Sequence, residues 1–234
     1  NETGSKPDTA ALASWWESIN KWRKTDCLKY DRDNTSVIKP QKVIETLWNM
    51  TKDDDVYITS DVGQHQMWAA QHLVIPGPRS WVSSGGLGSM GFALPASIGA
   101  QMAQPKKRVV HLCGDGGFQM TGMELYTAAR EGKKLISIVI NNSCLGMVRQ
   151  WQQVFYDKRY SSTILTPFNF VGFAKACGAD GATVTTCAEF TAALAKARKQ
   201  GKNFLIEAVV EQSDLVEPMV APGAVLDDFV KTDA

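Results

Sequence analysis

The sequence lacks several features that would place it in whole classes of protein. It has no Cys-x-x-Cys pair, and its five cysteines are odd in number and far apart. That pattern argues against a zinc site and a disulfide framework, and for a reducing compartment. The sequence also has no signal or transit peptide and no apolar run of about 18 residues, so we expect no membrane contact and, assuming a bacterial origin, a cytoplasmic protein.

An excess of charge of one sign is missing as well. The 25 basic residues nearly balance the 24 acidic ones, and they are scattered along the chain rather than gathered in a stripe. We therefore expect no nucleic-acid partner. A hydrophobic fraction of 44% and a charged fraction of 21% indicate a folded globular protein rather than a disordered one.

A length of 234 residues suits one sizeable domain with arms. We expect a connecting arm with a helix over 1–40, one domain over 41–215 and a tail over 216–234. The helical stretch 11–23 has an apolar face that a neighbouring domain would cover, built by Leu12, Trp15, Trp16, Ile19 and Trp22. Because the first residue is Asn rather than Met, we expect the chain to begin inside a longer protein.

Strands and helices are predicted to alternate after residue 40. Short β-branched runs predict buried strands at 56–59, 108–112, 135–140 and 204–210. Helical periodicity follows Pro40 and covers 67–73, 92–102, 120–130, 146–155, 168–177 and 188–199. This order predicts an α/β fold, a doubly wound and mostly parallel sheet with helices on both faces. Ligands bind beyond the carboxyl ends of such strands, so the loops after Thr59, Leu112 and Ile140 are the candidate site.

Two of these loops contain residues that suit a phosphate and a metal ion. Gly114-Asp115-Gly116-Gly117 opens a helix after one strand, where backbone N–H groups can approach a phosphate. A carboxylate at that place would repel a bare phosphate, so Asp115 predicts a divalent cation between the two. The amide oxygen of Asn142, at the end of the next predicted strand, would be a second hard ligand, and this set suits Mg²⁺.

Each motif also has a purely structural interpretation, since Gly-Asp-Gly forms turns and Asn-Asn caps helices. Together they are more specific, because 24 residues separate Gly116 from Asn141 and one crossover helix joins the two strand ends. A non-catalytic phosphate-binding or nucleotide-binding module of the doubly wound type remains an alternative. A dinucleotide module should show G-x-G-x-x-G after its first strand, and the glycines between Ser84 and Gly91 do not clearly follow that arrangement.

The Gly-Asp-Gly and Asn-Asn motifs at this interval resemble the diphosphate and magnesium motif of thiamine-diphosphate enzymes. Three further stretches, residues 61–70, 84–95 and 145–152, resemble acetohydroxyacid synthase (acetolactate synthase), and the similarity runs from about Pro40 to position 222. The resemblance implies the diphosphate-binding domain of the large catalytic subunit. That enzyme is a transferase and flavoprotein that condenses pyruvate with pyruvate or 2-oxobutyrate, with loss of CO₂, in branched-chain amino-acid biosynthesis.

The resemblance also implies roles for individual residues. Mg²⁺ would be held by the side chains of Asp115 and Asn142 and by the backbone carbonyl of Cys144. Trp151 would contact the second 2-oxo acid; the alternative is a Trp on the apolar face of a helix with Met147 and Val154. The cofactor-binding set is Gln64, His65, Gly88, Met90, Gly114, Asp115, Gly116, Gly117, Asn142, Gly146, Met147 and Val148.

Part of the implied enzyme has no counterpart in this sequence. The resemblance implies a catalytic glutamate on the pyrimidine-binding domain of a partner subunit, so we expect no catalytic residue on this chain and no activity from it alone. It also implies FAD, bound through a domain that is absent here. The intact enzyme is expected to be a homodimer or homotetramer with a regulatory small subunit. A subunit of another, split thiamine-diphosphate decarboxylase or carboligase is the alternative.

Overall fold

The computed structural model describes residues 7–33, 36–75, 77–226 and 228–230. These residues form two compact units, one within Asn1–Tyr30 and Glu217–Val230 and the other within Asp31–Val216. The ends of the predicted arm and tail, residues 1–6 and 231–234, lie outside the described residues. The predicted limits at 40 and 215 stay a prediction.

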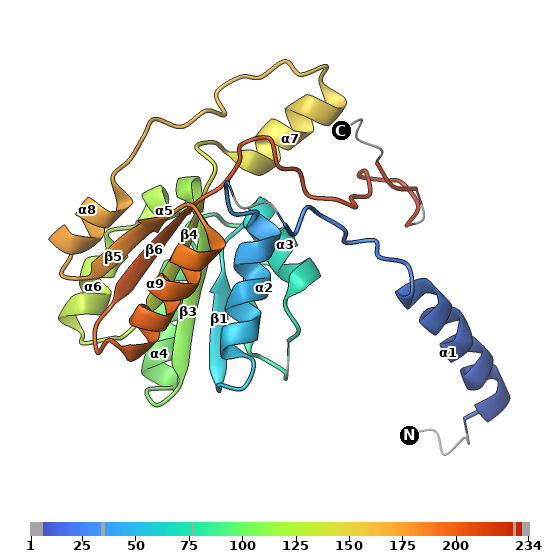
Figure 1. The fold of residues 1–234 in the computed structure, drawn as a ribbon, viewed down its shortest axis with the longest axis horizontal. Coiled ribbons are helices and arrows are strands. Elements are labelled where there is room, and N and C mark those ends of the chain that lie inside the picture. The colour runs from blue at the N-terminus through green and yellow to red at the C-terminus, as the bar shows by residue number, and fades with distance from the viewer. Residues whose placement is uncertain (1–6, 34–35, 76, 227, 231–234) are drawn as a thin grey trace. The chain divides into compact units, whose positions relative to one another are not determined.

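The larger unit is built on a six-stranded sheet with the order β2-β1-β3-β4-β6-β5, and every neighbouring pair is parallel (Figure 1). This arrangement confirms the predicted fold class. The strands are β1 (Val56–Ser60), β2 (Trp81–Ser83), β3 (Arg108–Gly114), β4 (Ile136–Asn141), β5 (Asp180–Val184) and β6 (Phe204–Val209). The four predicted strands are present, whereas β2 and β5 were not predicted.

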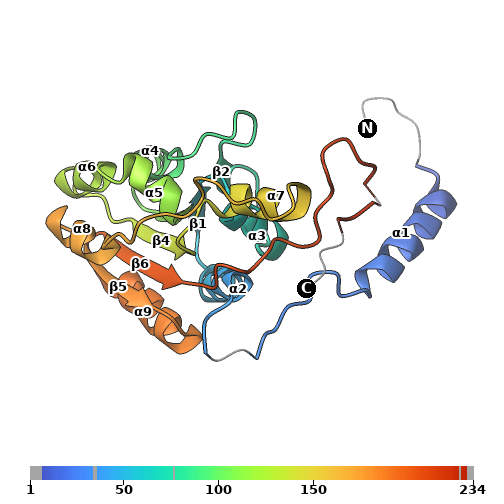
Figure 2. The same ribbon diagram turned by 90° about the horizontal axis from the view of Figure 1, so that it is seen from above.

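Helices cover both faces of the sheet. The helices of this unit are α2 (Pro40–Thr51), α3 (Gln64–His72), α4 (Ala93–Ala103), α5 (Asp115–Thr121), α6 (Glu124–Arg130), α7 (Gly146–Phe155), α8 (Phe170–Ala176) and α9 (Cys187–Lys199). Figure 2 shows α2 and α9 on one side of the sheet and α4, α5 and α6 on the other. Two separate clusters of buried side chains match these two layers.

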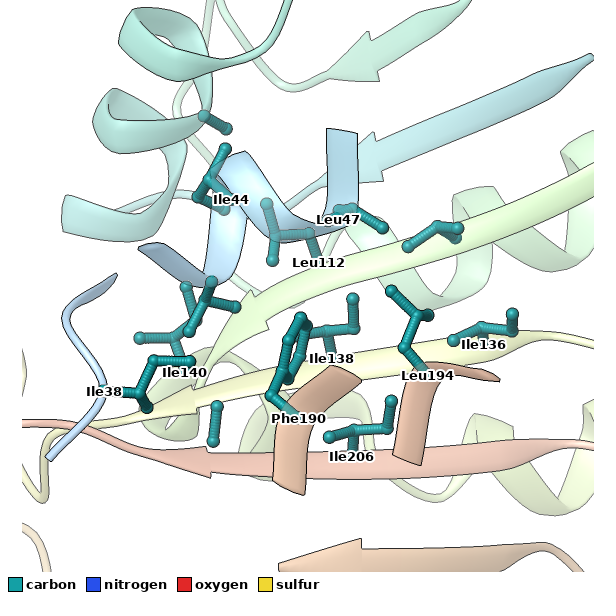
Figure 3. Close-up of a cluster of buried hydrophobic side chains, with 14 of the residues drawn as sticks. Ile38, Ile44, Leu47, Leu112, Ile136, Ile138, Ile140, Phe190, Leu194 and Ile206 are labelled. Atoms are coloured by element: carbon teal, nitrogen blue, oxygen red, sulfur yellow. The ribbon is translucent and has the colours of Figure 1, made fainter. Parts of the chain in front are cut away.

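Alternation along the strands divides the core between the two faces. In β3, Val110 and Leu112 belong to the cluster under α2, α3 and α9, while Val109 and Cys113 belong to the opposite cluster. Figure 3 shows the first cluster, where Phe190 of α9 packs over the central strands. Full burial of each such large side chain stabilises the fold by about 1.5–3 kcal/mol, so the strands that carry the site are held rigidly.

The prediction of one helix over 120–130 was wrong. Helix α5 ends at Thr121 and α6 begins at Glu124. Between them the backbone N–H groups of Leu125 and Tyr126 donate to carbonyls three residues earlier, those of Gly122 and Met123. This tighter turn interrupts the α-helical pattern, and apolar spacing alone does not reveal it.

The smaller unit contains α1 (Thr9–Arg23), and the predicted helix over 11–23 is confirmed. Asp8 caps it by accepting from the N–H groups of Ala10 and Ala11. Every α1 residue is described and none is buried; Trp15 and Trp22 are 55% and 58% exposed. The apolar face is thus uncovered within this unit. None of the helices among the described residues is long and apolar enough to span a membrane.

The strand order reverses between β1 and β3. From β1 the chain moves to β2 at one edge, and the next strand, β3, lies on the other side of β1. The loops that leave the carboxyl ends of β1 and β3 therefore diverge, and a crevice forms between them. This switch point is where the fold predicts a ligand site.

Candidate functional site

One pocket lies at the switch point and is lined by the loops that follow β1, β3 and β4. Eleven of its lining residues belong to the predicted cofactor-binding set, and Cys144 is there as well. The lining consists of Val62, Gly63, Gln64, His65, Trp68, Met90, Gly114, Asp115, Gly116, Gly117, Ile140, Asn142, Cys144, Leu145, Gly146, Met147 and Val148. The structure therefore brings together residues that are up to 86 positions apart in the sequence.

Asp115 is the carboxylate of the pocket. It is the first residue of α5, and its side chain is only 3% exposed. Burial raises its pKa to about 6, while the backbone N–H groups of Gly116, Ser143 and Cys144 favour the charged form and oppose the shift. The carboxylate thus faces the loop after β4, and no cation of the described protein residues forms an ion pair with it.

The side-chain oxygen of Asn142 lies next to Asp115, at the backbone amide of Cys144. The Cys144 N–H, which faces the Asp115 carboxylate, also donates to Asn142 Oδ1 at 3.3 Å. The Asn142 oxygen and the carboxylate therefore lie beside the same amide. The pKa of the Cys144 thiol is raised to about 11, first by burial and then by the charge of Asp115, so the thiol stays protonated and is a poor metal ligand.

His65 adds a nitrogen without a partner. Its side chain is 5% exposed, lines the pocket, and Nε2 makes no hydrogen bond among the described residues. Burial lowers its pKa to about 4, although a hydrogen bond to the Asp61 backbone favours the charged ring. A buried polar atom left unpaired costs about 1–3 kcal/mol, so this nitrogen is suited to a ligand atom in the pocket.

Asp61 supports the pocket, and sequence reasoning gave it no role. Its carboxylate, 1% exposed, accepts from the N–H groups of Gly91 at 2.9 Å and Phe92 at 3.0 Å. These bonds fix the loop next to Met90, which lines the pocket. Gly117 has no room for a larger side chain, because a Cβ there would overlap the Asp61 carboxylate. An acidic residue directly after a predicted strand was the available signal.

Gln64 is committed to contacts within the protein. Its Oε1 accepts from Asn142 Nδ2 at 3.0 Å, and its Nε2 donates to Gln150 Oε1 at 2.8 Å and to the Asp214 carbonyl at 3.1 Å. Gln150 is 0% exposed and is the only α7 residue that is buried. Sequence reasoning missed Gln150, because one polar residue in an amphipathic helix gives no sign of burial.

Gly88 and Trp151 lie outside the pocket lining. Gly88 is exposed, with φ of +66°, in the loop before α4. Trp151 is 40% exposed on α7, and its ring meets Phe155 edge-on at 5.7 Å between centroids. Their predicted roles stay predictions, and Trp151 is accessible to a ligand that approaches α7.

The pocket fits a divalent cation bound to a diphosphate. Among the described residues, no group of three or more His, Cys, Asp or Glu side chains could hold a metal. The fit rests instead on one carboxylate and one amide oxygen, those of Asp115 and Asn142, which are oxygen donors of the kind that Mg²⁺ accepts alongside phosphates. The unpartnered His65 Nε2 and the glycines around Asp115 suit the phosphate oxygens.

Comparison with known families gives a match over this region. The family model described as "Thiamine pyrophosphate enzyme, C-terminal TPP binding domain" matches residues 61–208. That range contains every loop of the pocket.

Similar proteins include acetolactate synthases from bacteria and yeast. The chain is 42% identical to "Acetolactate synthase isozyme 3 large subunit" of Escherichia coli K12 over 93% of this chain and 38% of that protein. It is 40% identical to "Acetolactate synthase large subunit" of Haemophilus influenzae over 98% of this chain and 40% of the relative. It is 41% identical to "Acetolactate synthase catalytic subunit, mitochondrial" of Saccharomyces cerevisiae, over 94% of this chain and 33% of that protein. The chain thus spans about two fifths or less of these relatives.

A solved structure has the same fold. It is a Rhodococcus jostii thiamine diphosphate-dependent 4-hydroxybenzoylformate decarboxylase, with a TM-score of 0.72 and 23% identity. The match covers 78% of this chain and 34% of that one. At this identity the likeness supports the α/β architecture alone.

Proposed function

Because the chain belongs to the thiamine pyrophosphate enzyme family, by its C-terminal cofactor-binding domain, we propose that it is the part of an acetolactate synthase large subunit that holds the diphosphate and Mg²⁺ of the cofactor. One observation carries the proposal. The Asp115 carboxylate, the Asn142 oxygen and the unpartnered His65 nitrogen meet in one pocket at the switch point of the sheet. The relatives of about 40% identity support the choice of acetolactate synthase.

Each residue has a defined task in this proposal. Asp115, Asn142 Oδ1 and the Cys144 carbonyl hold Mg²⁺, while His65 Nε2 and the backbone N–H groups around Gly116 bind the diphosphate. Met90, next to the loop residues that Asp61 anchors, would pack against the bound cofactor. The bound cofactor supplies an electron sink for decarboxylation of a 2-oxo acid. The protein supplies binding, orientation and a pocket that excludes water.

The proposed reaction condenses pyruvate with a second 2-oxo acid, pyruvate or 2-oxobutyrate, with loss of CO₂. Trp151 contacts this second acid, and its exposed position on α7 supports that role. Met147 and Val148, in the first turn of the same helix, line the reaction centre.

The Trp151 role predicts a change of acceptor preference. Losing contact with one methyl group costs about 1–3 kcal/mol, or roughly 10- to 200-fold in selectivity. The test uses a chimaera in which this chain replaces the matching part of the Escherichia coli isozyme 3 large subunit. In that protein, Trp151→Leu should shift the product from acetohydroxybutyrate towards acetolactate when pyruvate and 2-oxobutyrate compete. An unchanged product ratio would assign Trp151 to helix packing only.

The remaining parts of the enzyme are proposed to lie on other segments. A partner domain supplies the glutamate that activates the cofactor, a further domain binds FAD, and a homodimer or homotetramer associates with a regulatory small subunit. The proposed setting is the cytoplasm, which is supported by all five cysteines, each within the described residues, being free thiols. The relatives' longer chains support this division, because this chain matches only 38–40% of their length.

A chimaera tests the function directly. We predict that the chain alone makes no acetolactate when saturated with thiamine diphosphate and Mg²⁺, because proton transfer and water exclusion need the other domains. Substituting it for the matched part of the Escherichia coli isozyme 3 large subunit should give a protein that forms acetolactate in a colorimetric acetoin assay. The same chimaera with Asp115→Ala is the matched control. A folded chimaera that binds the cofactor but forms no acetolactate, or an active isolated chain, would contradict the proposal.

A further inference from the structure

Three buried side-chain amides form a continuous relay of hydrogen bonds that ends at Asn142. Asn142 bonds to Gln64, Gln64 to Gln150, and Gln150 to the backbone of Val216. The exposed fractions are 7% for Asn142, 5% for Gln64 and 0% for Gln150. The relay therefore runs through the interior from the segment after β6, through α7 and α3, to the loop after β4.

Val216 determines the direction of the first amide. Its N–H can only donate and its C=O can only accept, and both bond to Gln150. Gln150 must therefore place Oε1 at the Val216 N–H, 2.9 Å away, and Nε2 at the Val216 carbonyl, 3.0 Å away. A flipped Gln150 amide would set oxygen against oxygen and two donors against each other, so this orientation does not depend on how its amide atoms are assigned.

The orientation of the Gln150 amide in turn determines that of the second amide, Gln64. Gln150 Oε1 also faces Gln64, so Gln64 must present its Nε2 there, at 2.8 Å. The Asp214 carbonyl, 3.1 Å away, imposes the same choice because it can only accept. Gln64 Oε1 is then the atom left to face Asn142, and it requires the Nδ2 donor of that residue, at 3.0 Å.

We propose that Gln64 and Gln150 are positioning residues that compel Asn142 to present its oxygen, not its NH₂ group, to the metal. This inference rests on the proposed function, since it concerns the Mg²⁺ site that Asp115 and Asn142 form there. With Nδ2 committed to Gln64, Oδ1 turns to the Cys144 N–H, the amide that also faces the Asp115 carboxylate. Asn142 Oδ1 and the Asp115 carboxylate therefore lie side by side at the proposed metal site.

Without the relay, Asn142 has a competing orientation. A flipped Asn142 would turn its NH₂ group towards Asp115, where it could donate to the carboxylate that the metal needs. Two contacts oppose that flip. It would bring Asn142 Oδ1 against Gln64 Oε1, across the shorter bond of 3.0 Å, and the NH₂ group against the Cys144 N–H, across the longer bond of 3.3 Å. The relay thus keeps the carboxylate available before any metal arrives.

A double-mutant cycle tests the relay through metal affinity rather than activity. The chain is titrated with Mg²⁺ in the presence of a fixed excess of thiamine diphosphate, and binding is followed by calorimetry against a blank that contains the cofactor alone. Gln64→Met, which keeps a side chain of similar length, should lower Mg²⁺ affinity about 10- to 100-fold, as supporting residues of metal sites do. In an Asn142→Asp background, both side-chain oxygens are acceptors, so the same change should cause no loss or a gain.

Two further variants sharpen the test. Gln150→Met should lower Mg²⁺ affinity less than Gln64→Met, because the Asp214 carbonyl still orients Gln64. Gln101→Met is the matched control, since Gln101 is also buried and its Nε2 donates to two backbone carbonyls, those of Gln104 and Lys107, outside the pocket. It should leave metal affinity unchanged. Urea unfolding of each variant separates loss of affinity from loss of folding.

Three outcomes overturn the relay. An unchanged Mg²⁺ affinity in folded Gln64→Met would remove the orienting role. An equal loss in the original and the Asn142→Asp backgrounds would show that Gln64 acts directly on the diphosphate. Binding of thiamine diphosphate by the unaltered chain that ignores Mg²⁺ would instead remove the metal site of the proposed function, and with it the basis of the relay.

Discussion

Polar side chains at the two ends of the parallel sheet differ in burial and in their partners. At the carboxyl end, Asp115 and His65 are buried at 3% and 5% exposure, and the described residues give neither a cation for Asp115 nor a partner for His65 Nε2. At the amino end, Asp54 pairs with Arg198 at 2.8 Å and with Arg108 at 3.5 Å, and all three side chains are 29–32% exposed. At the carboxyl end the buried carboxylate of Asp115 is stabilised only by backbone N–H groups, whereas at the amino end the carboxylate of Asp54 is paired with two arginines in a half-buried position.

This difference supports the proposal that the ligand site lies at the carboxyl end. An exposed ion pair contributes at most about 1 kcal/mol, and losing it costs little. A buried polar group without a partner costs about 1–3 kcal/mol, so it persists only where the fold holds it in place. A ligand that supplies the missing partner, such as a metal bound to a diphosphate, recovers that cost on binding. This difference supports the carboxyl end as the proposed ligand site.

The largest expected difference between the two ends is in the loss of stability when a glycine is replaced by alanine. A Cβ at Gly146 would overlap Gln64 Oε1 and approach Asn142 Nδ2 to 2.5 Å, whereas a Cβ at Gly201, next to the amino end of β6, meets nothing within 4 Å. Gly146→Ala should lower the free energy of unfolding by about 3 kcal/mol, because it crowds a filled site and breaks buried hydrogen bonds. Urea unfolding measures both variants.

Gly201→Ala is the control for this pair and should leave the unfolding free energy within about 1 kcal/mol of the original. Similar losses for the two alanine variants would contradict the contrast between the ends of the sheet.

Lowering the pH should destabilise the protein through His65, by less than the Gly146→Ala replacement does. The pKa of His65 is lowered to about 4 by burial, so its contribution to stability is complete above its ordinary pKa of 6.5 and is lost as the pH falls towards 4. Between pH 7 and pH 5 this one histidine removes about 2 kcal/mol. Replacing it by Asn should shrink the acid-induced loss by that amount, while the opposing contributions of Asp61 and Asp115, whose pKa values are raised, stay in place.

His72, at the other end of α3, is the matched histidine. Burial lowers its pKa too, but Glu45, 3.3 Å from Nδ1, favours the charged ring. His72→Asn should therefore change the acid response less than His65→Asn. Thermal or urea unfolding at pH 7 and pH 5 compares the two variants. A larger effect for His72→Asn than for His65→Asn would contradict the proposed difference between the two ends of the sheet.

The sequence was sufficient to predict the central strands and to place Asp115 and Asn142 after the ends of two of them. The buried runs that form β3, β4 and β6 are mostly apolar, with one buried polar residue in each, and unusual polar residues follow β3 and β4, which points to Asp115 and Asn142. β5 begins Asp180-Gly181, with no continuous apolar run, and β2 has only three residues. Both are strands because neighbouring strands pair with them, which is a tertiary effect.

The supporting residues could not be found in the same way. Gln150 is buried because α7 packs against the segment at Val216, and Gln64 and Gln150 are 86 residues apart. No local pattern reports a contact of that separation. Asp61 likewise caps the loop at Gly91, 30 residues away, and its strand-end position alone does not distinguish a cap from a ligand.

The central claim is that Asp115 holds Mg²⁺ on the diphosphate, and calorimetric titration with thiamine diphosphate tests it most directly. The unaltered chain should bind with Mg²⁺ and show little binding in EDTA. Asp115→Asn should lower the affinity in Mg²⁺ more than about 100-fold, beyond the range typical of supporting residues. Asp54→Asn, which removes the half-buried carboxylate paired at the amino end, should leave the cofactor affinity unchanged. Equal affinity in Mg²⁺ and EDTA, or an Asp115→Asn variant that binds as well as the original, would contradict the account.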